Sequence, residues 1–116
     1  MWELELELIE DWLLHLPDAD YDLVLAAFEV LQSEGPKLGR PLVDTIKHSR
    51  IKNLKELRPG STGRSEIRIL FVFDPTRKAL MLIAGDKTGK WDAWYKKNIP
   101  LAEQRYEDYM KQKNKG

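Results

Sequence analysis

The segment 66–84 constrains the fold more than any other part of this 116-residue chain. Residues 66–74 and 79–84 are rich in β-branched, leucine and aromatic side chains, and the Asp-Pro-Thr-Arg sequence between them is typical of a tight turn. Two strands joined this closely must be antiparallel. Because the second strand is apolar on both faces, we expect it near the centre of a sheet that is covered on both sides.

The residues before this hairpin show one strand pattern and two helix patterns. Alternation of apolar and acidic residues over 2–7 predicts a short half-buried strand, and helical spacing follows over 8–16 and about 19–34. Asp18 or Asp20 is the expected N-cap of the second helix. Gly35, followed by a proline, is expected to end that helix in a left-handed conformation. These helices form a hairpin with one apolar face each.

The rest of the chain completes an α+β pattern. Residues 36–50 lack a clear period and are expected to form a loop, whereas 53–58 predict a strand of mixed polarity. One or two helical turns are expected over 91–97, and Pro100 is expected to begin a last helix. We therefore predict one α+β domain over 1–116, an antiparallel sheet with an N-terminal helical hairpin and a C-terminal helix. The tail, 111–116, is expected to fray.

Charge is unevenly distributed, although the chain is neutral overall with 19 basic and 19 acidic residues. Residues 1–46 carry 11 acidic and 2 basic side chains, whereas residues 47–97 carry 13 basic and 5 acidic ones. The basic part could bind phosphates, and the acidic part could keep nucleic acid from the other face or pair with the basic part. A mixed, solvated surface is the alternative interpretation.

Several classes of site and location are disfavoured by composition. The chain has no cysteine, which excludes disulfides and thiolate metal sites and fits a reducing compartment. Its two histidines lack ligand spacing, and it contains no glycine-rich phosphate-binding motif. No apolar run approaches the ~20 residues that cross a bilayer, and the acidic start is unlike a signal peptide. We expect a cytoplasmic protein with no metal, no cofactor and no membrane contact.

Arg68 is the most informative candidate functional residue. Alternation along the strand 66–74 places it on the same face as Leu70 and Val72, so its stem crosses apolar surface. A guanidinium in that position is either paired or faces a cleft, and it offers a planar set of donors that suits phosphate. An ion pair with Glu56 on a neighbouring strand is the structural alternative to a phosphate-binding role.

The basic loop 85–90 follows the second strand of the hairpin. It contains Lys87 and Lys90, and its flanking glycines could let backbone N–H groups approach an anion. Trp91, Trp94 and Tyr95 follow directly. Cations interleaved with aromatic rings suit single-stranded RNA, because charge binds phosphate and rings stack on bases. The alternative is that at least one of the two tryptophans anchors a short helix to the core.

Several of these segments, in this order and spacing, resemble the HigB-type toxins of the RelE/ParE superfamily, in particular their phage-derived branch. The resemblance covers about residues 2–110. It rests on the matching segments Gly35–Pro41, Leu54-Lys55-Glu56-Leu57-Arg58, Arg68–Asp74, Gly85-Asp86-Lys87, Trp94-Tyr95 and Ile99-Pro100-Leu101-Ala102.

This resemblance implies a compact RelE-like, microbial-RNase-like α+β fold. It also implies cleavage of messenger RNA on the ribosome without a metal ion, held in check by a cognate antitoxin that we expect to be a helix-turn-helix protein. By resemblance, Arg68 contacts the scissile phosphate, Lys87 and Lys90 form the basic loop, and Tyr95 lies near the site. The candidate catalytic residues are therefore Arg68, Lys87 and Tyr95, and the candidate RNA-binding residues are Lys55, Arg58, Arg64, Lys90 and Trp94.

Two other functions stay open from the sequence. One is a non-catalytic toxin or phage regulator that binds a protein, as the gyrase-directed ParE branch does, and the other is a plain RNA-binding module. The neutral net charge departs from the strongly basic character of many relatives. No histidine lies between Glu66 and Tyr95, so we expect the general acid and base to be poor ones, a lysine or a tyrosine with an ordinary pKa of about 10. The sequence does not decide which of them is the acid and which is the base.

Overall fold

The structure is a computed structural model that describes residues 1–115, with the backbone alone for the last of these. Short 3₁₀ turns occupy Glu7–Ile9 and Gly35–Lys37. The strands and helices, in chain order, are β1 (Glu3–Glu5), α1 (Glu10–Leu14), α2 (Asp18–Glu34), β2 (Val43–Thr45), β3 (Lys55–Leu57), β4 (Ile67–Phe73), β5 (Lys78–Asp86) and α3 (Trp91–Lys115).

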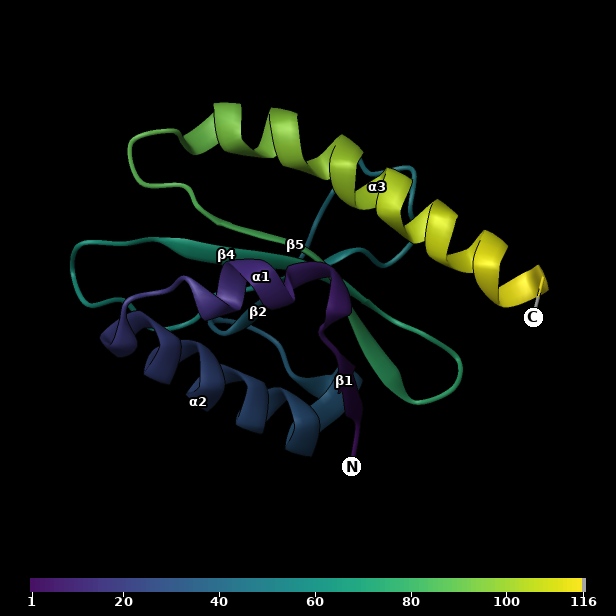
Figure 1. Cartoon of the computed structure of the whole chain (residues 1–116), viewed down its shortest axis with the longest axis horizontal. Coiled ribbons are helices and arrows are strands. Elements are labelled where there is room, and N and C mark those ends of the chain that lie inside the picture. Colours follow the sequence, from purple (N-terminus) through teal and green to yellow (C-terminus); the bar gives the residue numbers. More distant parts are fainter. Residues whose placement is uncertain (116) are drawn as a thin grey trace.

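The five strands form one sheet in the order β1-β5-β4-β3-β2, with α1 and α2 on one face and α3 on the other (Figure 1). The pairs β2–β3, β3–β4 and β4–β5 are antiparallel. The predicted α+β class and the central position of the hairpin are confirmed. The sheet is nevertheless mixed, because β1 pairs parallel with β5.

Alternation along β4 divides the core into two halves, as its sequence predicts. Ile67, Ile69 and Phe71 are buried in the cluster beneath α1 and α2. Leu70 and Val72 are buried on the opposite face, in the cluster that α3 covers. The side chain of Arg68 therefore projects from the α3 face of the sheet, beside Leu70 and Val72.

The N-terminal helices differ from expectation in their details. The first helix, predicted over 8–16, is shorter than expected and consists of a 3₁₀ turn followed by α1. The N-cap of α2 is Pro17 rather than Asp18 or Asp20, and it makes no side-chain hydrogen bond. Gly35 does end α2, with a φ of 63°. The expected loop 36–50 contains β2, which the sequence pattern missed because only Val43 of its three residues is buried.

The C-terminal helix is one continuous element rather than two. α3 passes through Pro100, because apolar side chains on both sides of the proline share one stripe that packs on the sheet. The tail is also helical up to Lys115, and residue 116 lies outside the described residues. Lys113 donates a 3.3 Å hydrogen bond to the buried carboxylate of Asp74. Within residues 1–115, none of the helices has the length and apolar character that crossing a membrane requires.

Candidate nucleic-acid interface

The candidate site lies where β3, β4 and β5 meet the first turns of α3. Arg68 is paired with Gly85 across the β4–β5 ladder, and Glu56 is paired with Leu70 across the β3–β4 ladder. Paired residues point to the same face of a sheet, so Glu56 and Arg68 both face α3. Lys87 follows β5 immediately, and its backbone N–H donates to the Glu66 carbonyl over 3.0 Å.

Arg68 is half-buried and forms no ion pair with another described residue. Its Nη1 donates a 2.8 Å hydrogen bond to the carbonyl oxygen of Ile67, and its Nε is buried without a partner. The alternative in which Arg68 pairs with Glu56 is therefore wrong for this structure. The guanidinium keeps donors for a ligand.

Glu56 is instead paired with Arg58. Its residue is 1% exposed, and Oε1 accepts a 2.8 Å hydrogen bond from Arg58 Nε. Arg58 Nη2 also donates to Asp44 over 3.2 Å. These two carboxylates orient the Arg58 guanidinium and raise its pKa, chiefly through the hydrogen bond that Arg58 donates to Glu56.

Three buried side-chain atoms of the described residues lack a hydrogen-bond partner, and all three belong to this region. They are Glu56 Oε2, Glu66 Oε2 and Arg68 Nε. Glu56 and Glu66 both act electrostatically on Lys87, which lies among them. Unpaired buried polar atoms are rare because each costs about 1–3 kcal/mol. Their concentration at one place makes this region the candidate functional site.

Lys87 is a buried cation held between two aromatic rings. The residue is 5% exposed, and its Nζ lies 4.1 Å from the ring centroid of Trp91 and 5.2 Å from that of Tyr95. Burial lowers the pKa of its ammonium, and the neighbouring positive charge of Arg68 lowers it further. Contacts with the negative faces of the rings offset part of this cost.

Tyr95 has the opposite shift. Burial and the neighbouring carboxylate of Glu56 raise the pKa of its phenol to about 12. The phenol is therefore protonated throughout the physiological range and can donate a proton or a hydrogen bond. The ammonium of Lys87 lies over the ring of Tyr95, and the same surroundings shift the pKa values of these two groups in opposite directions.

A surface groove of about 560 Å³ passes beside this cluster. Arg58, Arg64 and Arg68 line it together with Glu66 and Thr88. Arg64 is exposed on the loop that precedes β4, and Lys90 is exposed on the loop that follows β5. The groove therefore brings together three of the predicted cations from segments that are distant in sequence.

Two predicted RNA-contacting residues lie elsewhere. Lys55 precedes Glu56 on β3 and so points to the other face of the sheet, where its Nζ donates to Thr45 Oγ1 over 3.0 Å. Trp94 is 6% exposed and packs in the α3-side core, so its ring is a core contact and offers no face to a base. A side chain at Gly85 would collide with Trp94, because its Cβ would lie 2.6 Å from Nε1.

Backbone N–H groups of the loop after β5 are bonded within the protein. The N–H of Thr88 donates to Asp86 Oδ1 over 2.9 Å, and the N–H of Lys90 donates to the Lys87 carbonyl over 2.8 Å. The Lys87 N–H is bonded to the Glu66 carbonyl as well, so three N–H groups of the loop are used within the protein. The loop therefore contributes chiefly side chains to the candidate site.

Glu56, Glu66 and Trp91 are members of the site that the residue assignments above leave out. The sequence did contain a signal for Glu56. It lies in the predicted strand 53–58, where its side chain can face the same side of the sheet as Arg68. Trp91 could not be distinguished from Trp94 by sequence, because both belong to the same helical turns. Within residues 1–115, no group of three or more histidine and acidic side chains is arranged to hold a metal ion.

Comparison with known proteins gives one family and two named relatives. The model of the family described as "Phage derived protein Gp49-like (DUF891)" matches residues 11–107. The chain is 54% identical over 111 residues to a Mycobacterium tuberculosis (strain ATCC 25618 / H37Rv) protein named "Putative toxin HigB2", covering 96% of this chain and 55% of that protein. It is 45% identical over 108 residues to one from the same strain named "Putative toxin HigB3", covering 93% of this chain and 92% of that protein. The chain thus spans about half the length of the first relative. No solved structure matches the chain.

Proposed function

Because the chain belongs to the phage-derived Gp49-like family, with HigB-named relatives, we propose that it is the toxin of a toxin–antitoxin pair and cleaves messenger RNA on the ribosome without a metal ion. The observation that carries this proposal is Arg68, a guanidinium that forms no ion pair within the described residues and lines a groove with two further arginines. Such a groove matches the spaced negative charges of a single RNA strand.

The proposed cleavage is a single transesterification step. The ribose 2′-oxygen attacks the adjacent phosphorus, the bond to the 5′-oxygen breaks, and a 2′,3′-cyclic phosphate and a 5′-hydroxyl end result. Arg68 binds the phosphate and stabilises the charge that develops on its oxygens, an effect commonly worth about 3–4 kcal/mol for one well-placed donor. Arg58 and Arg64 bind flanking phosphates and hold the strand in line.

The opposed pKa shifts support an assignment of proton transfer. Lys87 has a lowered pKa, and its neutral amine accepts the proton of the 2′-hydroxyl. Tyr95 has a raised pKa and donates its phenolic proton to the leaving 5′-oxygen. Glu56 is a positioning residue, because it orients Arg58 and keeps Tyr95 protonated. Both proton-transfer groups are weak at neutral pH, which suits an enzyme that relies on positioning by the ribosome.

We also propose that the antitoxin docks away from this site, over the acidic surface beside β1. A groove of about 370 Å³ on the α2 side of β1 is lined by Leu4, Leu6, Leu25 and Phe28, with Glu3 and Glu29 at its rim. A partner segment that combines apolar and Lys or Arg side chains fits this lining. Charge complementarity would speed association and select the partner, and the apolar contacts would set the residence time.

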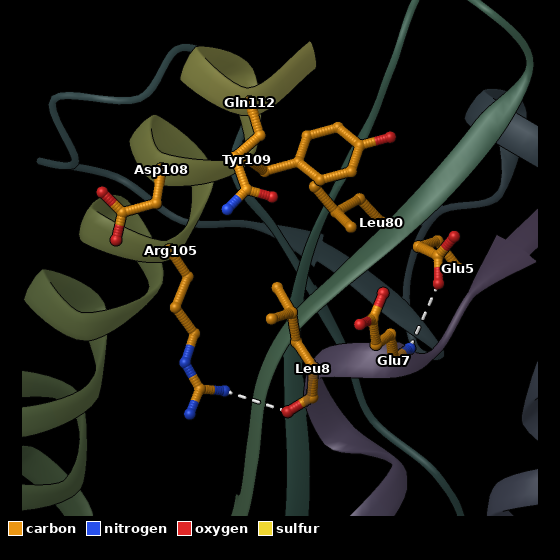
Figure 2. Close-up of a pocket in the computed structure, with 8 residues that line it drawn as sticks. All are labelled: Glu5, Glu7, Leu8, Leu80, Arg105, Asp108, Tyr109 and Gln112. Atoms are coloured by element: carbon orange, nitrogen blue, oxygen red, sulfur yellow. Dashed lines mark hydrogen bonds between the residues drawn. The ribbon is translucent and has the colours of Figure 1, made fainter. Parts of the chain in front are cut away.

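The α3 side of the same strand is acidic too. Figure 2 shows Glu5, Glu7 and Asp108 around Leu8 and Tyr109 in a second pocket, of about 260 Å³. Arg105 also lines this pocket but forms no ion pair with these carboxylates, and its Nη1 donates to the carbonyl oxygens of Leu8 and Leu82 over 3.2 and 2.7 Å. A basic segment of the antitoxin would therefore meet carboxylates on both sides of β1.

Induced expression with primer-extension mapping of cellular messenger RNA tests the main proposal. We expect growth arrest and new 5′ ends within translated regions, and both should disappear in Arg68→Ala. The exposed Lys52→Ala removes one positive charge outside the groove and should keep both effects. A protein that arrests growth without new RNA ends would be a non-catalytic, protein-binding toxin. An Arg68→Ala variant that loses RNA affinity when the parent shows no turnover would be a plain RNA-binding module.

A further inference from the structure

Trp91 is an exposed aromatic side chain beside the candidate site. It is 59% exposed and is the one aromatic residue among the large apolar side chains that the described part of the chain leaves exposed. It belongs to neither buried hydrophobic cluster, whereas Trp94 and Tyr95, three and four residues later, both pack with the α3-side core. Much of this indole is therefore available to contact a ligand.

Lys87 holds this exposed ring in place. Its ammonium lies 4.1 Å from the ring centroid, so one face of the indole is fixed by a buried cation while much of the side chain stays open to solvent. A ring that is already oriented loses little conformational freedom when a ligand stacks on it. Lys87 thus pre-organises Trp91.

The ring also has the right neighbours for RNA. Trp91 follows Thr88, which lines the arginine groove, by three residues, and Lys87 links it to Arg68 electrostatically. We infer that the open face of Trp91 stacks on the nucleobase that adjoins the phosphate bound by Arg68, forming a subsite for one unstacked base. This inference rests on the proposed function, because it takes the groove to hold an RNA strand.

Stacking on a fixed indole has chemical consequences. A base–aromatic contact tolerates any base but strengthens with the area of the base, so purines should bind better than pyrimidines at this position. Because the subsite neighbours the cleaved phosphate, it would bias where cleavage falls within a message. The preference would come from one ring rather than from hydrogen bonds to base edges.

The test measures the dissociation constants of a 12-nucleotide single-stranded RNA and of a series of variants of it, each of which lacks the base at one position. For one of these positions, the unmodified protein should bind the abasic RNA about 10-fold or more weakly than the intact RNA. Trp91→Ala should remove that discrimination, and Trp91→Phe should keep most of it. Leu101→Ala, which truncates another exposed apolar residue of α3, should leave it unchanged.

The outcomes separate this inference from the proposed function. If Arg68→Ala weakens binding of all RNAs but Trp91→Ala still discriminates against the abasic position, the base subsite is refuted and the phosphate groove stands. If Trp91→Ala weakens intact and abasic RNA equally, the ring acts only through Lys87 and the subsite is again refuted. If Arg68→Ala changes nothing, the proposed function itself fails.

Discussion

Replacing Arg68 with alanine should abolish toxicity without unfolding the protein. The guanidinium forms one hydrogen bond, to the carbonyl of its chain neighbour Ile67, and no ion pair with the described residues. Removing that bond costs about 1 kcal/mol. The change also eliminates the unpaired buried Nε and the repulsion between Arg68 and Lys87, both of which oppose folding. We therefore expect the free energy of unfolding to change by no more than about 1 kcal/mol.

The expected effect on activity is much larger. Loss of one donor to the charge of the transition state costs about 3 kcal/mol, which corresponds to a rate reduction of roughly 10²-fold or more. Arg68→Lys keeps the charge but not the planar set of donors, so it should fall between alanine and the parent. Growth after induction, the rate of reporter-message cleavage in a translation extract, and urea denaturation measure these quantities together.

Two results would contradict this reasoning. An Arg68→Ala protein that arrests growth as fast as the parent would remove Arg68 from the site. A loss of about 3–5 kcal/mol in unfolding free energy would mean that Arg68 is one half of a buried ion pair, as the alternative from the sequence supposed. Lys52→Ala should match the parent in all three assays, since Lys52 is exposed and lies outside the groove.

The remaining predictions concern the loop, a buried carboxylate, the phenol and the antitoxin. Lys90→Ala should weaken RNA binding and reduce the slope of log K against log salt concentration by about 0.7, whereas Lys87→Ala should chiefly slow cleavage; an unchanged slope in Lys90→Ala would place the loop off the RNA path. Burial raises the pKa of Asp74, but hydrogen bonds from its neighbours outweigh burial and lower the pKa below 3.8. The ionised carboxylate therefore stabilises the fold fully above pH 3.8, and this stabilisation is lost as the pH falls through the lowered pKa. Asp74→Asn should be less stable than the parent by about 2 kcal/mol in urea unfolding at pH 7, and its stability should depend less on acid. Because the pKa of Tyr95 is about 12, cleavage by the parent should show no loss from phenol ionisation up to pH 10, whereas Tyr95→Phe should be slow at every pH tested. Leu25→Arg should weaken antitoxin binding in calorimetry while leaving toxicity intact, and a variant with full antitoxin affinity would move the docking surface elsewhere.

The amino-acid sequence by itself determined the elements whose signals are local. The hairpin of β4 and β5, the two faces of β4 and the helix α2 follow from side-chain period and turn residues, which act over a few positions. Arg68 could be singled out for the same reason, because alternation along one strand decides which face a residue occupies.

The tertiary structure decided what depends on contacts between distant segments. The parallel pairing of β1 with β5 joins residues more than seventy positions apart, and no local pattern encodes the direction of such a pair. The uninterrupted helix α3 was decided in the same way, because packing of its apolar stripe on the sheet outweighs the hydrogen bond lost at Pro100.

The candidate site shows the same division most clearly. Composition predicted cations and aromatic rings, but only the fold determined that Trp94 is buried while Trp91 stays exposed. The fold also determined that Glu56 pairs with Arg58 and that Arg68 forms no ion pair with the described residues. The physical reason is that burial and ion pairing depend on which strands become neighbours. Residue type sets which interactions are possible, and the sheet order sets which of them form.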